Sequence, residues 1–144
     1  MREVLFRGKA TNRDPDYYYR TDYKNGDWVY GLLTETENYM GFAEMTNTDG
    51  VSGIDVDKNT IGQYTGLTDK NGNKIFEGDI VAGALQWLEQ KKNGIVTFRD
   101  GSFGLLWYRG EAEHFNPFTS MCNVIYEVIG NIHDNPELLK GGAE

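Results

Sequence analysis

The stretch that decides the fold covers residues 63–81 and reads QYTGLTDKNGNKIFEGDIV. Residues 64–67 and 75–81 have the composition of strands, and Asn71-Gly72 between them tolerates the positive φ values of a tight turn. Gly78-Asp79 adds a second turn, whose aspartate can accept hydrogen bonds from nearby backbone. We therefore expect the chain to fold back on itself here and the rest of the fold to be built around this bend.

The composition favours β structure. The 144 residues include nine Tyr, seven Phe and three Trp, enough for a real core, while 18 Gly and three Pro indicate many turns. The strongest hairpin signal joins residues 95–98 to 103–108 through a turn at Asp100-Gly101. We predict a mostly β fold with minor α structure, in which an N-terminal β-hairpin precedes a strongly bent sheet or small SH3-like barrel in the second half.

We predict a single domain over residues 1–144, made of an N-terminal β part (1–62), a barrel-like part (63–139) and a mobile tail (140–144). The N-terminal hairpin would pair residues 17–19 with residues 28–33. Residues 39–45 and 84–92 fit either a helix or a strand, and residues 110–120 are expected to be mostly loop. The last strand is placed at 124–132, with a short helical turn beginning near Pro136.

Charge and cysteine content restrict the location and the partners. The formal net charge of -8 repels phosphate backbones, so contact with nucleic acid is disfavoured. The single cysteine, Cys122, forms no internal disulfide, and no apolar run reaches the roughly 20 residues of a membrane helix. We expect a soluble cytoplasmic protein that does not contact membranes.

Several segments, in this order, resemble the YopX family. They are residues 60–67 (TIGQYTGL), 69–72 (DKNG), 75–81 (IFEGDIV) and 127–138 (EVIGNIHDNPEL), with further matches at Phe6-Arg7, 28–31 (WVYG) and 100–104 (DGSFG). The resemblance spans residues 6 to 139. One departure is Gly8-Lys9, where the family often has Ala-Trp.

The resemblance implies a phage- or prophage-encoded, mostly β protein in the cytoplasm of a bacterial host. The family has no established biochemical activity, so it transfers no catalytic residues to this chain.

Two segments begin like calcium-binding loops, at Asp55 and at Asp69. An EF-hand loop requires Gly at its sixth position and Glu at its twelfth. These positions hold Thr60 and Gly66 in the first segment and Lys74 and Ile80 in the second. Both segments fail the pattern, so we interpret these aspartates as turn-forming residues.

Other chemical patterns are equally weak. His114 and His133 lack the further ligands that zinc needs, and Cys122 is expected to be a small buried hydrophobe. No phosphate-binding loop is present. The carboxylates of Glu35, Glu37, Glu111 and Glu113 are interpreted as solvated. We predict no cofactor, metal or small-molecule ligand, and no enzymatic activity.

An aromatic surface in the N-terminal part is the main candidate site. It consists of Tyr17, Tyr18, Tyr19, Trp28 and Tyr30. Alternation along a strand points Tyr18 away from its two neighbours, so at least one of the three is exposed. We predict that this surface binds another protein or a second copy of the chain.

The alternatives are contact with nucleic acid and an acidic surface that imitates DNA. Structural turns are predicted at Gly66, Asn71, Gly72, Gly78, Asp79, Asp100, Gly101 and Gly130.

Overall fold

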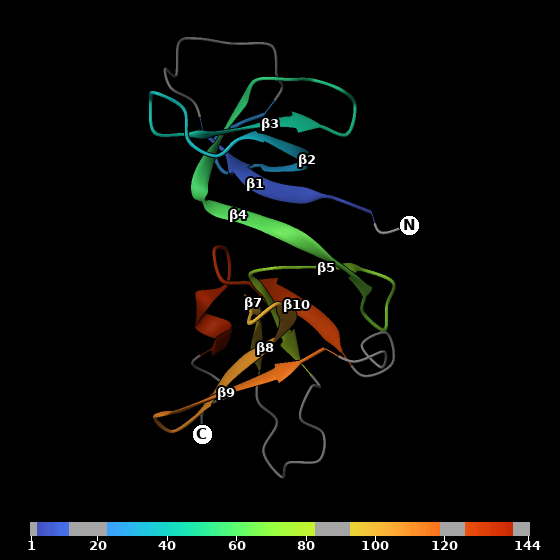
Figure 1. Cartoon of the computed structure of the whole chain (residues 1–144). Helices are drawn as coiled ribbons and strands as arrows, with labels where there is room; N and C mark the ends of the chain where they lie inside the picture. The colour runs from blue at the N-terminus through green and yellow to red at the C-terminus, as the bar shows by residue number, and fades with distance from the viewer. Residues whose placement is uncertain (1–2, 12–22, 83–92, 119–125, 140–144) are drawn as a thin grey trace. The chain divides into compact units, whose positions relative to one another are not determined.

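The structure, a computed structural model, describes residues 3–11, 23–82, 93–118 and 126–139 (Figure 1). Regular structure in these residues is β strand, apart from the 3₁₀ turn η1 (Pro136–Leu139). The chain divides into two compact units, Met1–Tyr64 and Thr65–Glu144, which we describe separately. The mostly β fold expected from the sequence is confirmed, while the single-domain organisation stays a prediction.

The first unit is a ring of antiparallel strands: β1 (Phe6–Ala10), β2 (Trp28–Glu35), β3 (Ala43–Asn47) and β4 (Ile54–Thr68), whose last residues belong to the second unit. β1 pairs with both β2 and β4, which closes the ring. Alternate side chains point inward, and Val29, Met45 and Val56 are fully buried there. Burying such side chains stabilises the unit by roughly 1.5–3 kcal/mol each.

The close approach of β2 to β3 depends on Gly31. A Cβ atom at this position would lie 1.9 Å from the carbonyl oxygen of Thr46. No side chain fits there, so the sequence at Gly31 fixes how tightly the β2–β3 hairpin pairs.

The second unit contains a sheet of five antiparallel strands in the order β10-β6-β7-β8-β9. They are β6 (Asp79–Ala82), β7 (Gly94–Arg99), β8 (Ser102–Arg109), β9 (Ala112–Pro117) and β10 (Glu127–Asn131), and the short β5 (Lys74–Phe76) pairs with the end of β4. The core of this unit is formed by Ile75, Val81, Val96, Leu105, Trp107 and Tyr126. In this sheet β6 comes first along the chain and β10 comes last, and the two strands pair with each other.

The turn between β7 and β8 has the predicted form. Arg99 pairs with Ser102, and both intervening residues have positive φ, 52° at Asp100 and 84° at Gly101. This is the backbone of a type I′ turn, which matches the twist of the flanking strands.

Several sequence-based expectations are corrected. Residues 112–117, expected to be loop, form β9, because pairing with β8 supplies the hydrogen bonds that their weak apolar pattern did not indicate. Residues 64–67, predicted as a short strand, belong to the much longer β4 (Ile54–Thr68). In the first unit, where a β-hairpin was expected, the strands close into a ring.

The structure answers one question that the sequence left open, and other predictions concern residues outside the described part of the chain. Residues 39–45 form a turn followed by β3, and β2 pairs with β1 and β3. The predicted pairing of residues 17–19 and the state of residues 84–92 fall outside the described part of the chain. Within that part, no helix is both long and apolar enough to cross a membrane.

Candidate functional site

The predicted aromatic surface is only partly described. Tyr17, Tyr18 and Tyr19 lie outside the described residues, whereas Trp28 and Tyr30 both lie on the outward face of β2. Trp28 is half-buried and Tyr30 exposes 40% of its surface. Leu32, two residues further on the same face, exposes 52%. The outward face of β2 is thus apolar, although the sequence singled out its aromatic residues alone.

Two cationic side chains of the neighbouring strand β1 lie over the ring of Trp28. The guanidinium carbon of Arg7 lies 4.7 Å from the Trp28 ring centroid and the ammonium nitrogen of Lys9 lies 5.4 Å from it. Both distances are within cation–π range. Arg7 is buried, so its contact with Trp28 belongs to the internal packing of the first unit.

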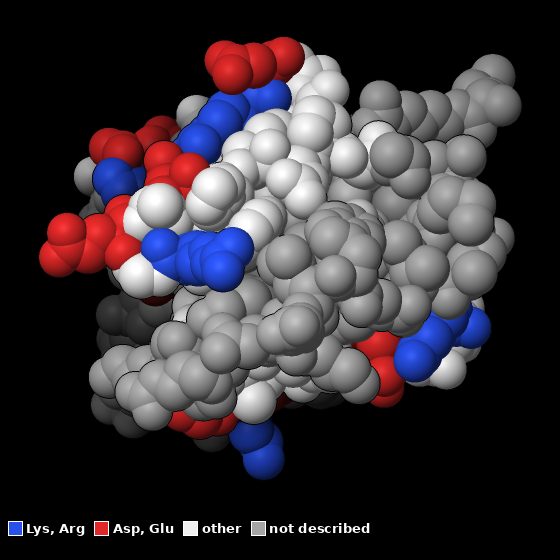
Figure 2. Space-filling view, turned by 90° about the horizontal axis from the view of Figure 1, so that it is seen from below, with Lys and Arg blue, Asp and Glu red and all other residues white. Residues whose placement is uncertain are grey.

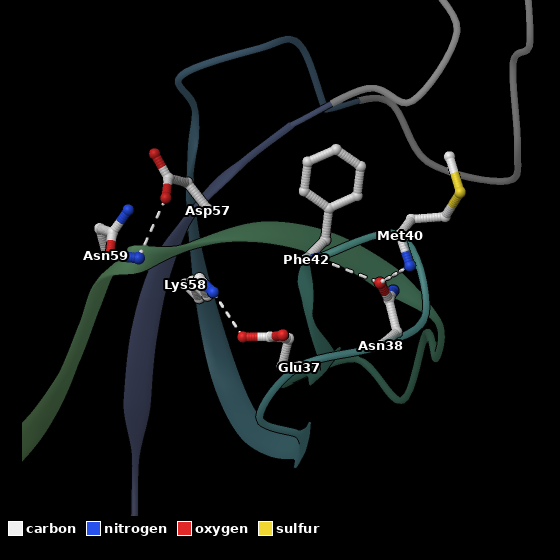
Figure 3. Close-up of polar contacts among 7 residues, drawn as sticks. All are labelled: Glu37, Asn38, Met40, Phe42, Asp57, Lys58 and Asn59. Atoms are coloured by element: carbon white, nitrogen blue, oxygen red, sulfur yellow. Dashed lines mark hydrogen bonds and ion pairs between the residues drawn. The ribbon is translucent and has the colours of Figure 1, made fainter.

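The β2–β3 turn adds the most exposed aromatic side chain among the described residues. Tyr39 exposes 88% of its surface and Met40 exposes 50%. The turn is held by Asn38, whose side-chain oxygen accepts hydrogen bonds from the backbone N–H groups of Met40 and Phe42, both at 3.0 Å (Figure 3). The backbone closes with Asn38 N–H donating to the Phe42 carbonyl at 2.6 Å and Gly41 N–H to the Asn38 carbonyl at 2.9 Å.

Carboxylates form a row beneath this turn. A register shift between Leu33 and Glu35 places Glu35 opposite Glu44, which in turn lies opposite Asp55 on β4. Cross-strand partners share a face of the sheet, and like charges directly opposite each other are unfavourable. The Asn38 amide reduces this cost by donating to Glu44 Oε2 at 2.9 Å and Asp55 Oδ1 at 3.2 Å.

The start of the turn is fixed by charge as well. Lys58 on β4 pairs with Glu37 through Nζ and Oε1, and the Asp57 carboxylate accepts a hydrogen bond from Asn59 N–H at 3.0 Å (Figure 3). Glu37 is an exposed loop residue, as expected from the sequence, and this ion pair links it to β4.

A family model for the YopX protein matches residues 14–140, most of the chain. The chain belongs to the YopX family. A crystal structure of protein EF1440 from Enterococcus faecalis is similar in fold, with 23% identity, a TM-score of 0.53, and coverage of 96% of this chain and 99% of that one. No curated protein matches the chain.

In the second unit of this YopX-family chain, Asp69 forms a buried clasp. Its Oδ1 accepts hydrogen bonds from the N–H groups of Asn71 and Asn73, both at 2.9 Å, and its Oδ2 accepts one from Val128 N–H on β10 at 2.9 Å. Burial raises the pKa of Asp69, but the backbone donors of Val128, Asn73 and Asn71 outweigh it and leave the pKa below the ordinary 3.8. Asp69 thus joins the β4–β5 turn to a strand far along the chain.

The segments that begin like calcium loops do not present ligands together. Asp55 lies in β4 with its side chain bonded to Asn38, and Asp69 turns its oxygens toward backbone donors. Among the described residues, no group of three or more His, Cys, Asp or Glu side chains is placed to hold a metal ion.

The histidines lie apart in different settings. His114 stacks on Trp107, its partner across β8 and β9, with ring centroids 4.3 Å apart. His133 follows β10 in a turn, where its N–H donates to the Asn131 side chain at 3.0 Å. Cys122 lies outside the described residues, so its predicted burial stays a prediction.

The predicted turn residues divide into two groups. Asn71, Gly72, Gly78, Asp100 and Gly101 lie in turns, and Asp79 follows Gly78 with its Oδ2 accepting a hydrogen bond from Phe76 N–H at 2.7 Å. Gly66 and Gly130 lie inside β4 and β10 instead. At Gly130, a Cβ atom would come within 2.6 Å of Asn135 Oδ1, so close packing, and not a turn, requires glycine there.

Charges of both signs are interleaved on part of the surface. Lys70 pairs with Glu127 at 3.3 Å and Arg99 pairs with Glu113 at 3.2 Å. Figure 2 shows red and blue atoms next to one another at the upper left of the face in view. Exposed ion pairs such as Lys70–Glu127 and Arg99–Glu113 contribute at most about 1 kcal/mol each to stability.

Proposed function

We propose that this YopX-family chain is a non-enzymatic protein-interaction module that recognises its partner through the β2–β3 hairpin of the first unit. The observation that carries the proposal is the outward face of β2, where Tyr30 and Leu32 expose 40% and 52% of their surfaces. Isolated exposed apolar residues are normal on protein surfaces. Here the apolar side chains recur at alternate positions of one strand, and two more follow in the adjoining turn at Tyr39 and Met40.

The proposal also includes the cellular location of the chain. Members of the family are associated with phages and prophages, so we propose that the chain acts in the cytoplasm of a bacterial host. The partner is a host or phage protein, or a second copy of the chain.

Affinity capture of the tagged chain from cells of its source organism tests this function. The matched variants are Tyr30→Thr/Leu32→Thr, which removes the apolar face of β2, and Tyr108→Thr, which removes an aromatic side chain with 48% exposure on β8. We expect the same protein to be retained by the original chain and by Tyr108→Thr and lost by the β2 variant. A strictly monomeric chain that retains nothing, or retention unaffected by the β2 variant, would contradict the proposal.

A second candidate function is contact with nucleic acid. It is favoured by the cationic side chains of Arg7 and Lys9 at the Trp28 ring, since cations beside aromatic rings are common in single-strand binding. The burial of Arg7 and the net charge of -8 oppose it. Titration with labelled single- and double-stranded DNA at low salt decides between the two, because an electrostatically assisted complex is tightest there.

A variant of the first proposal is that the acidic surface imitates DNA and occupies the DNA-binding site of another protein. The row formed by Glu35, Glu44 and Asp55 supports it. It predicts that DNA competes with the chain for the captured partner.

A further inference from the structure

We infer that the turn at residues 38–42 is a preformed anchor, which inserts Tyr39 and Met40 into an apolar pocket bordered by basic side chains on a different protein. This inference rests on the proposed function and names the part of the hairpin that binds and the chemistry of the partner.

The same backbone frame occurs in other turns of the chain. At residues 47–51, Asn47 Oδ1 accepts from Asp49 N–H at 3.0 Å and Val51 N–H at 2.8 Å, Asn47 N–H donates to the Val51 carbonyl, and Gly50 N–H donates to the Asn47 carbonyl. The turn at residues 69–73 repeats these bonds with Asp69 and Gly72. The frame depends on an Asn or Asp followed three positions later by a glycine with φ near 85°.

The frame places no requirement on the side chains of the two residues between these positions. They are Thr48 and Asp49 in the second turn and Lys70 and Asn71 in the third, all exposed and polar. Of these three turns, only the first has large apolar residues at the two positions, Tyr39 and Met40, and the frame does not require them. Tyr is enriched at binding hot spots because it offers a large contact area with few rotatable bonds.

The turn is also ordered before any partner arrives. The Asn38 side chain uses its oxygen for two backbone donors and its amide for two carboxylates, and Lys58 holds Glu37 at the entrance (Figure 3). A preordered loop loses less conformational entropy on binding than a flexible one. Tyr39 is thus presented on a fixed base while it exposes 88% of its surface.

The negative charge of residues 28–58 indicates the chemistry of the partner's binding site. From residue 28 to residue 58 the only cation in the sequence is Lys58, against the carboxylates of Glu35, Glu37, Glu44, Asp49, Asp55 and Asp57. Partners are steered and selected by complementary potential, so the pocket that receives Tyr39 is bordered by Lys or Arg. A second copy would bring the same carboxylates opposite each other with a net charge of -8 on each chain, which disfavours self-association through this turn.

The first step of the test uses a photoreactive phenylalanine analogue placed at position 39 of the full chain, in cells of the source organism. The matched control carries it at position 48, in the turn with the same frame. We expect an adduct with a different protein from position 39, at a site flanked by Lys or Arg, and no such adduct from position 48. Absence of any adduct at 39, or an adduct only with a second copy, overturns the inference.

The second step titrates the purified adduct partner with the unmodified chain and three variants. Tyr39→Thr/Met40→Asp gives the first turn the residues of the second, and Thr48→Tyr/Asp49→Met makes the reverse change in the control turn. We expect the first variant to lose about 30-fold or more in affinity, as for a hot spot, the second to stay within about threefold, and binding to weaken with salt.

The third variant, Tyr30→Thr/Leu32→Thr, separates the inference from the proposed function. If binding is lost with this variant but unchanged in Tyr39→Thr/Met40→Asp, the inference is overturned and the proposed function stands. If neither variant changes binding, both are overturned. An unchanged circular dichroism spectrum of each variant shows that the fold is intact.

Discussion

The turns at residues 38–42 and 69–73 have the same hydrogen-bonded frame and opposite surroundings. Asp69 is buried and its second oxygen binds Val128 N–H, so this turn holds parts of the second unit together. Asn38 directs its amide to Glu44 and Asp55, and its turn exposes Tyr39. One local structure therefore serves as an internal clasp in one unit and as a platform for side chains in the other. The difference lies in a single atom of the first residue, an oxygen acceptor in Asp69 and a nitrogen donor in Asn38.

Asp69→Ala is expected to have the largest effect on stability. It removes the acceptor for the N–H groups of Asn71, Asn73 and Val128. A buried donor without an acceptor costs about 1–3 kcal/mol, but Asn71 and Asn73 are exposed and water replaces the acceptor there, so we expect a loss of about 2–3 kcal/mol in all. Urea unfolding followed by circular dichroism measures it. A loss under about 1 kcal/mol would show that the clasp contributes little.

Asp69→Asn separates the frame from the clasp. Asn38 and Asn47 show that an asparagine supports the turn, but an amide nitrogen cannot accept from Val128 N–H as Oδ2 does. We expect a smaller loss, about 1–2 kcal/mol, and faster hydrogen exchange at the Val128 amide, with the Asn73 amide still protected. Equal acceleration at both amides would mean that the frame also fails.

The pH dependence of stability gives an independent measure of the clasp. The pKa of Asp69 is lower in the folded chain than its ordinary 3.8, so the ionised carboxylate stabilises the fold above that value. This contribution is lost as pH falls through the folded pKa. We expect the difference in unfolding free energy between the original chain and Asp69→Asn to be constant above about pH 5 and to shrink below 3.8. A difference that grew in acid would contradict the assignment.

Asn38→Asp makes the first turn resemble the third. The frame keeps its acceptor, but the donor to Glu44 and Asp55 is replaced by another carboxylate. We expect a loss of about 1 kcal/mol at neutral pH and low salt, reduced in part by added salt, because repulsion between these half-buried carboxylates is partly screened. Thermal unfolding at two salt concentrations measures it, and a loss that does not depend on salt would point to a defect in the frame.

Tyr39→Thr/Met40→Asp is expected to have the smallest effect on stability. Both side chains are largely exposed, and the substituted residues occur at the same positions of the turn at 47–51. We expect a change within about 0.5 kcal/mol. A loss of more than about 1.5 kcal/mol in thermal or urea unfolding would mean that these side chains pack within the fold.

The sequence predicted the fold class and the clearest turns, because both depend on local patterns. Asp100-Gly101 specifies its hairpin through positive φ values, and Pro136 begins the short 3₁₀ turn as expected. The ring of the first unit was not predicted, since β1 pairs with a segment more than 40 residues away. β9 was missed because its residues alternate weakly and are held by pairing with β8.

The candidate site was predicted only in outline. Residues 39–45 read as one apolar run, which hid the turn at Gly41 and the exposure of Tyr39. The spacing of Asn38 to Gly41, repeated from Asn47 to Gly50 and from Asp69 to Gly72, was present in the sequence and would have indicated the turn. The carboxylate row depends on the register shift before Glu35, which no local pattern shows.

The most direct measurement of the central claim maps the contact on the chain itself. Backbone amide chemical shifts of the labelled full chain are recorded with and without the purified partner identified by the cross-link at position 39. The account predicts that the largest changes fall on residues 38–42 and on Tyr30 and Leu32, with none at residues 69–73. Changes confined to residues 65–139 would contradict it.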